Sequence, residues 1–190
     1  MPDILRHIIG NNVFMIATLK SKFNRKRLTK VAFELLVVIL IVVAVQMWRS
    51  KDMLETDGSI TVEPVTTVSL QGETLTLFDR PQNTLIYFFA PWCRVCAWSI
   101  GSLEGLDKNN TNIVVIAMDY GSVEAVQRFV QEHNVNVPVA LGNRAVAQQF
   151  SIRGYPSYYL LNENNQVVAK HFGYTTSMQI KLQQWLAIQS

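Results

Sequence analysis

The hydrophobic pattern of the chain begins with one long apolar run near the N-terminus. Residues 31–48 (VAFELLVVILIVVAVQMW) contain only two polar side chains, Glu34 and Gln46. A helix of this length extends about 27 Å, close to the roughly 30 Å hydrocarbon core of a bilayer, and flanking residues complete the span. We therefore predict a transmembrane helix over residues 31–48.

A cleaved secretory signal is the alternative interpretation of this run, because the uninterrupted stretch 35–45 has the length of a signal's apolar region. About thirty residues precede the run, however, and Gln46, Met47 and Trp48 leave no small-residue cleavage site after it. These two features favour an uncleaved anchor.

Downstream of the run the pattern becomes that of a folded domain. Residues 49–63 are polar and without helical periodicity, which predicts a spacer, and we expect the domain to occupy residues 64–190. Strands are expected at 84–90, 112–119, 137–141, 157–162 and 167–172 after a hairpin at 66–79, with helices at 93–108, 122–133, 144–150 and 176–188. This alternation predicts an α/β domain with a mostly parallel central sheet and an antiparallel hairpin at its edge.

Charge divides the chain at the same place as hydropathy. The net charge is +3, but residues 1–30 hold seven Lys or Arg against one Asp, and the remainder is mildly acidic. A nucleic-acid-binding face needs clustered cations, so this distribution argues against one on the domain. By the positive-inside rule, residues 1–30 stay in the cytoplasm, the anchor contacts membrane lipid, and the domain is exported.

The candidate chemistry is concentrated in PWCRVCAW, residues 91–98, which follow a buried strand and begin a helix. Cys93 and Cys96 are the only cysteines, and their spacing allows a disulfide within one helical turn. The exposed amides at the helix start favour a Cys93 thiolate, which predicts a lowered pKa for Cys93. Arg94 either turns toward this sulfur and lowers that pKa further, or is a solvated surface residue.

Two motifs together resemble the thioredoxin superfamily. The stretch LIYFFAPWCRVC (85–96) resembles its active-site strand, turn and helix, and GYPS (154–157) resembles its cis-proline loop, which implies that Pro156 lies against the disulfide. With the anchor and an added segment at 122–150, the chain is similar to the TlpA, ResA and DsbE branch. That resemblance implies a thioredoxin-like fold with a central mixed sheet, a single-pass location in the bacterial inner (cytoplasmic) membrane, and a domain in the periplasm.

The sequence departs from thioredoxin at several positions. Tyr87 stands where thioredoxin has a buried acid that assists proton removal from the second thiol. Asp119 and Glu104 are the nearest acids by element order, and we favour an ordinary surface position for both because acids are mostly solvated. Tyr155 precedes the proline, and its backbone is expected to pair with an extended substrate. Trp92 forms part of the substrate face or packs against the domain. The aromatic residues elsewhere are expected to pack within the domain: Tyr158, Tyr159, Phe172 and Trp185.

The resemblance implies thiol-disulfide exchange on protein substrates, in which Cys93 attacks a substrate disulfide and Cys96 resolves the mixed disulfide. We favour a reductant that acts in cytochrome c maturation and is reset by a membrane-embedded donor of the DsbD or CcdA type, over a disulfide-forming oxidant. A Cu(I)-binding module that uses both thiolates is the alternative of another class. Neither His133 nor His171 lies near the motif in sequence, and we expect no resident metal or other cofactor.

Overall fold

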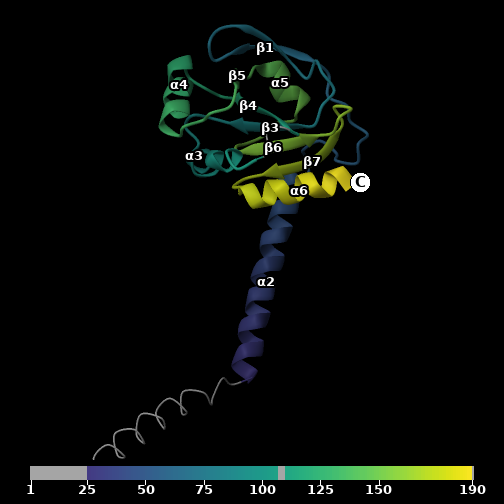
Figure 1. Cartoon of the computed structure of the whole chain (residues 1–190). Helices are drawn as coiled ribbons and strands as arrows, with labels where there is room; N and C mark the ends of the chain where they lie inside the picture. Colours follow the sequence, from purple (N-terminus) through teal and green to yellow (C-terminus); the bar gives the residue numbers. More distant parts are fainter. Residues whose placement is uncertain (1–24, 107–109, 190) are drawn as a thin grey trace, which may run out of the picture. The chain divides into compact units, whose positions relative to one another are not determined.

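The computed structural model describes residues 25–106 and 110–189, and most of the predicted cytoplasmic segment 1–30 lies outside them. The described chain consists of two units, which meet between Met47 and Trp48. The first is the greater part of helix α2 (Arg25–Ser50), and the second is a folded α/β domain (Figure 1).

Helix α2 is longer than the predicted span 31–48 at both ends. Every described side chain between Arg27 and Met47 is exposed, and the segment Arg27–Ser50 is long and apolar enough to cross a membrane. Lys30 and Glu34 lie one helical turn apart, with Nζ and Oε1 separated by 3.9 Å. A helix that is apolar on every face is suited to lipid, so α2 indicates a membrane anchor.

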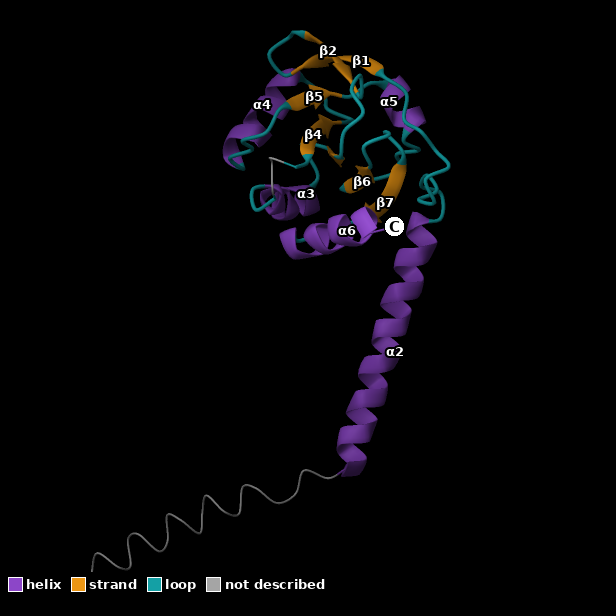
Figure 2. Cartoon of the chain, turned by 45° about the vertical axis from the view of Figure 1, so that its right-hand side comes forward, coloured by secondary structure: helices purple, strands orange, loops and turns teal. Residues whose placement is uncertain are grey.

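The domain is built on a seven-stranded sheet with the order β2-β1-β5-β4-β3-β6-β7 (Figure 2). The strands are β1 (Val65–Ser69), β2 (Thr74–Leu77), β3 (Thr84–Phe89), β4 (Asn112–Ala117), β5 (Val139–Leu141), β6 (Ser157–Leu161) and β7 (Val167–Phe172). Only β3, β4 and β5 pair in parallel, whereas β1 joins β5 and β6 joins β3 in antiparallel fashion. The thioredoxin-like mixed sheet is confirmed, but it is less parallel than the alternation of elements indicated.

Helices cover both faces of this sheet. They are α3 (Arg94–Ser99), the 3-10 helix η1 (Ile100–Leu103), α4 (Val123–Glu132), α5 (Arg144–Gln149) and α6 (Ser177–Gln189). Strand β3 is buried along its whole length: Leu85, Tyr87 and Phe89 pack with α3, α4 and α6, while Ile86 and Phe88 face the α5 side. Figure 1 shows α3 and α6 on one side of the sheet and α5 on the other.

The single helix expected over 93–108 is wrong, because α3 ends at Ser99 and continues only as η1. Gly101 and Gly105 explain why the helix does not continue, since each glycine lowers helix stability by about 1 kcal/mol relative to alanine. Gly105 also lies against the start of α6, where an added Cβ would meet the Ser177 Cβ at 3.4 Å. That distance is an ordinary van der Waals contact, so packing against α6 does not require a glycine at this position.

The segment between α2 and β1 lies along the domain. Met53 and Val62 are buried in the core on the α5 face, and the Val62 N–H donates to the Asn165 carbonyl at 2.8 Å. Lys170 Nζ on β7 donates to the Met53 carbonyl at 3.3 Å. The chain therefore enters the domain beside its edge strand β7.

Candidate functional site

The two cysteines form a disulfide at the start of α3, with their Cα atoms 5.2 Å apart. Cys93 is the N-cap residue, and its Sγ accepts a hydrogen bond from the Cys96 N–H at 3.1 Å. Cys93 retains 7% of its surface in contact with solvent, whereas Cys96 is fully buried. The same N–H is placed to stabilise a thiolate on Cys93 once the disulfide is reduced.

Strand pairing places the GYP turn beside the cysteine turn. In the antiparallel ladder between β3 and β6, Phe88 pairs with Ser157, so the preceding Pro156 falls opposite Phe89. The Tyr155-Pro156 peptide bond is cis, as the resemblance implied, and Pro156 is buried. The two motifs, about sixty residues apart in sequence, therefore meet at one edge of the sheet.

Trp92 and Tyr155 contact each other at this edge, and each also forms a hydrogen bond with Asp119, which follows β4. Trp92 Nε1 donates to the Asp119 backbone carbonyl at 2.9 Å, and the Tyr155 hydroxyl donates to Asp119 Oδ2 at 2.9 Å. The two rings meet edge to face, with centroids 5.9 Å apart. Burial, together with the Asp119 carboxylate, raises the pKa of Tyr155, so its phenol stays neutral. Trp92 itself remains exposed, with a rim available to a partner.

A groove of about 450 Å³ lies between α3 and α4 and contains Cys93 and Arg94 in its wall. Arg94 is exposed, and within the described part of the chain it forms no salt bridge. The α4 side supplies residues that the sequence analysis missed as site residues, including Arg128, Phe129 and His133. Phe129 stacks on Phe89 of β3 at a centroid distance of 4.7 Å.

The core cluster that contains Cys96 also contains Tyr87, whose hydroxyl forms a buried pair with Ser99. Tyr87, where thioredoxin has its carboxylate, is completely buried, and its hydroxyl lies 2.6 Å from Ser99 Oγ. Ser99, one turn after Cys96 in α3, donates to the Val95 carbonyl at 3.1 Å. Burial raises the pKa of Tyr87, so this position holds a neutral phenol at physiological pH.

The acids nominated from sequence occupy different places. Asp119 is exposed but lies at the site, where it accepts the Tyr155 hydrogen bond. Glu104 is exposed just after η1. His133 lines the groove that contains Cys93, although the two residues are forty positions apart in sequence. The sequence alone therefore did not indicate that they are neighbours. In the described residues, no three His, Cys, Asp or Glu side chains are grouped to hold a metal.

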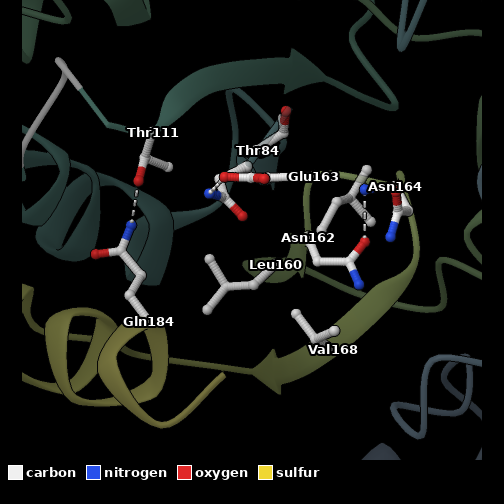
Figure 3. Close-up of a pocket in the computed structure, with 10 residues that line it drawn as sticks. Thr84, Thr111, Leu160, Asn162, Glu163, Asn164, Val168 and Gln184 are labelled. Atoms are coloured by element: carbon white, nitrogen blue, oxygen red, sulfur yellow. Dashed lines mark hydrogen bonds between the residues drawn. The ribbon is translucent and has the colours of Figure 1, made fainter. Parts of the chain in front are cut away.

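Another cavity, of about 350 Å³, lies at the opposite end of β3 (Figure 3). It is lined mainly by amide, hydroxyl and aliphatic side chains, and Gln184 Nε2 donates to Thr111 Oγ1 there at 3.1 Å. Among the described residues that line it, Glu163 is the only ionisable one. Because the cysteines follow the other end of β3, this cavity is separate from the disulfide chemistry.

Comparison with known proteins agrees with this geometry. Residues 61–170 match the AhpC/TSA family. The chain belongs to that thioredoxin-like family. It is 24% identical over 119 residues to thioredoxin-like protein YneN of Bacillus subtilis, a match that covers 60% of this chain and 70% of that protein. It is 25% identical over 117 residues to thiol-disulfide oxidoreductase ResA of Halalkalibacterium halodurans, covering 59% of this chain and 66% of that protein.

A solved structure shares the fold at lower identity. A putative thiol:disulfide interchange protein DsbE from Chlorobium tepidum superposes with a TM-score of 0.62 at 17% identity, covering 70% of this chain and 99% of that chain. The predicted family and fold are therefore confirmed, and the protein is a thiol-disulfide oxidoreductase.

Proposed function

We propose that this membrane-anchored oxidoreductase acts on protein disulfides outside the cytoplasm, with Cys93 as the attacking and Cys96 as the resolving cysteine. The observation that carries the proposal is the different position of the two cysteines of one disulfide. Cys93 lies in the wall of an open groove, whereas Cys96 is fully buried and does not line it. A substrate sulfur therefore meets Cys93 first.

The exchange proceeds in two balanced steps. The Cys93 thiolate attacks a substrate disulfide, forming a Cys93–substrate bond and releasing one substrate thiolate, which takes up a proton. The Cys96 thiol loses its proton and attacks Cys93 Sγ, which closes the Cys93–Cys96 disulfide and releases the second substrate thiol. Two electrons and two protons pass to the substrate.

The substrate contacts are proposed to come from both sides of Cys93. On one side, the backbone at Tyr155 and Pro156 pairs with an extended substrate segment, and Trp92 offers its exposed rim. On the other side, Arg94 lines the groove between α3 and α4. Protein substrates fit this arrangement because an extended chain can follow the groove past Cys93.

The physiological direction is proposed to be reduction, as the resemblance to the TlpA, ResA and DsbE branch implies, with cytochrome c maturation as the process served. The domain then lies in the periplasm, the basic segment before α2 lies in the cytoplasm, and the anchor holds the protein in the bacterial inner membrane. A membrane-embedded donor of the DsbD or CcdA type returns electrons to the oxidised pair.

The reduction potential of the full chain in lipid nanodiscs tests the direction. The protein is equilibrated in graded thiol buffers and its free thiols are trapped with an alkylating reagent. Mass spectrometry then gives the fractions of reduced and oxidised protein. A potential near or below the roughly −270 mV of thioredoxin supports a reductant, whereas one near the roughly −120 mV of DsbA identifies an oxidant. Wild-type exchange activity in Cys93→Ser would contradict the assignment of the attacking cysteine.

Cu(I) binding by the two thiolates is the candidate of another class, and it rests on the cysteine pair alone. Within the described residues, no third His, Cys, Asp or Glu is grouped with the pair to hold a metal. Stoichiometric copper retention by the reduced chain against a Cu(I) chelator, lost in Cys96→Ser, would support this function. A reduced chain that yields its copper to the chelator excludes it.

A further inference from the structure

Helix α6 presents three glutamines to the domain and four large apolar side chains to the outside. Three glutamines form its inward hydrogen bonds: Gln179 with His171 at 3.0 Å, Gln183 with Tyr158 at 2.5 Å and Gln184 with Thr111 at 3.1 Å. Ile180 is the one completely buried apolar side chain among the described side chains of this helix. The usual pattern of a surface helix, apolar inside and polar outside, is reversed here.

The outward face of α6 carries four large apolar side chains, Met178, Leu182, Trp185 and Leu186, which we name the α6 stripe. Each is between 52% and 76% exposed. Their spacing of four, seven and eight residues from Met178 places them along one side of the helix. The expectation that Trp185 packs within the domain is therefore wrong. A contiguous apolar surface of this kind marks an interaction site.

The point where the chain enters the domain lies next to the same edge strand. The Arg49 guanidinium carbon is 5.9 Å from the Phe172 ring centroid on β7, and Met53 is buried a few residues later. Helix α6 lies alongside β7, which it contacts through His171 (Figures 1 and 2). The entering chain and α6 therefore flank one strand from its two faces.

This placement determines what the α6 stripe can reach. The apolar run of the anchor continues to Trp48, so only a few residues separate the membrane from β7. A connection this short keeps the edge of the domain within reach of the lipid surface. Trp185 in the stripe and the exposed Tyr174 before it are aromatic residues that suit the headgroup region, and exposed Lys181 can pair with anionic headgroups.

We propose that the α6 stripe inserts into the lipid interface of the membrane that the anchor spans. This inference rests on the proposed anchor and extends it. The domain is then attached at two places, by its tether and by α6, so it cannot turn freely about the tether. Such a docked domain holds Cys93 in a constant orientation relative to the membrane, which suits exchange with a membrane-embedded electron donor.

The test uses the full chain in nanodiscs loaded with one copy each, made of phosphatidylcholine and phosphatidylglycerol with or without brominated acyl chains. Bromine quenches tryptophan fluorescence only at short range. Three variants each retain one of the four tryptophans, with the others changed to Phe: Trp185 in the α6 stripe, Trp48 at the anchor, or Trp92 before Cys93. Trp92 is a matched control because it is 68% exposed, compared with 56% for Trp185.

An indole about 5–10 Å deep in the interface should lose about half of its emission in brominated discs, and we expect this of Trp185 and of Trp48. Trp92 should lose less than about a tenth, because it borders the groove beside α4 and not α6. Changing Met178 and Leu182 to Gln should restore most of the Trp185 emission and leave the quenching of Trp48 unchanged. Protease resistance of the domain confirms that each variant is folded.

Two results would overturn the proposal in distinguishable ways. Quenching of Trp48 without quenching of Trp185 refutes docking and leaves the anchor intact, whereas absence of both refutes the anchor as well. Discs loaded with two copies examine the competing occupant. If Trp185 becomes protected from aqueous iodide only in those discs, and is never quenched by bromine, a second copy covers the stripe and lipid does not.

Discussion

The two cysteines of this protein are three residues apart, yet they lie in very different surroundings. Cys93 borders an open groove, close to the exposed rim of Trp92 and the Arg94 side chain. Cys96 is fully buried on the same sheet face as Tyr87, whose hydroxyl contacts Ser99. The difference implies a division of labour, since only the outer sulfur is placed to meet a substrate and only the inner one is protected until it resolves the intermediate.

Substitution of each cysteine in turn should have the largest effect on exchange activity, because the two have different roles. We expect Cys93→Ser to abolish exchange with a model protein disulfide such as insulin, because the remaining thiol, Cys96, is fully buried. Cys96→Ser should still attack but should accumulate a mixed disulfide, visible as a substrate adduct in non-reducing mass spectrometry. Adducts of equal yield in both variants would refute the assignment of roles.

The buried hydroxyl pair gives the next largest effect. Tyr87→Phe removes a buried hydrogen bond, which should lower the free energy of unfolding in urea by about 1–2 kcal/mol. Tyr159→Phe is the matched control, since Tyr159 is equally buried on the opposite sheet face and its hydroxyl donates to the Phe150 carbonyl at 2.8 Å.

Both variants should therefore lose stability, but only Tyr87→Phe should change the rate at which Cys96 resolves a mixed disulfide. The change should be small, about threefold or less, because a neutral phenol is not a general base at physiological pH. The rate is measured by rapid mixing with a substrate that carries a fluorescent thiol. A large loss confined to Tyr87→Phe would show instead that the phenol moves the proton of Cys96.

The same division explains which parts of the site could be predicted from sequence. The disulfide and its flanking strand are local features, so the CxxC spacing and an apolar run that matches β3 located them. Arg128, Phe129 and His133 were missed because periodicity places them on α4 but does not say which element α4 faces. The outward Trp185 was misassigned for a related reason, since apolar spacing alone does not say which side of a helix meets the sheet.

A smaller effect is expected on the Cys93 side from Tyr155→Phe. The variant removes the hydroxyl that donates to Asp119, at a half-buried position, and should release Asp119 from the turn beside Trp92. We expect a fall of up to about fivefold in kcat/KM for a protein disulfide, equal to about 1 kcal/mol, with stability changed by less than that amount. Tyr174→Phe is the control, because Tyr174 is exposed and does not line the groove of Cys93. Equal activity of the two variants would show that the Tyr155 hydroxyl has no part in substrate recognition.

The smallest effect should come from Arg94, whose charge lies beside Cys93 in a solvent-exposed position. Exposed charges interact weakly and are screened by salt, so Arg94→Ala should slow alkylation of reduced Cys93 by about twofold at low ionic strength and by less at high salt. Arg144→Ala, at an exposed position of α5 on the other sheet face, provides the matched loss of charge. A salt-dependent difference between the two variants means that Arg94 turns toward the sulfur and stabilises the thiolate. Identical rates mean that Arg94 is a solvated surface residue, and that the N–H donated by Cys96 is the nearer source of stabilisation for the thiolate.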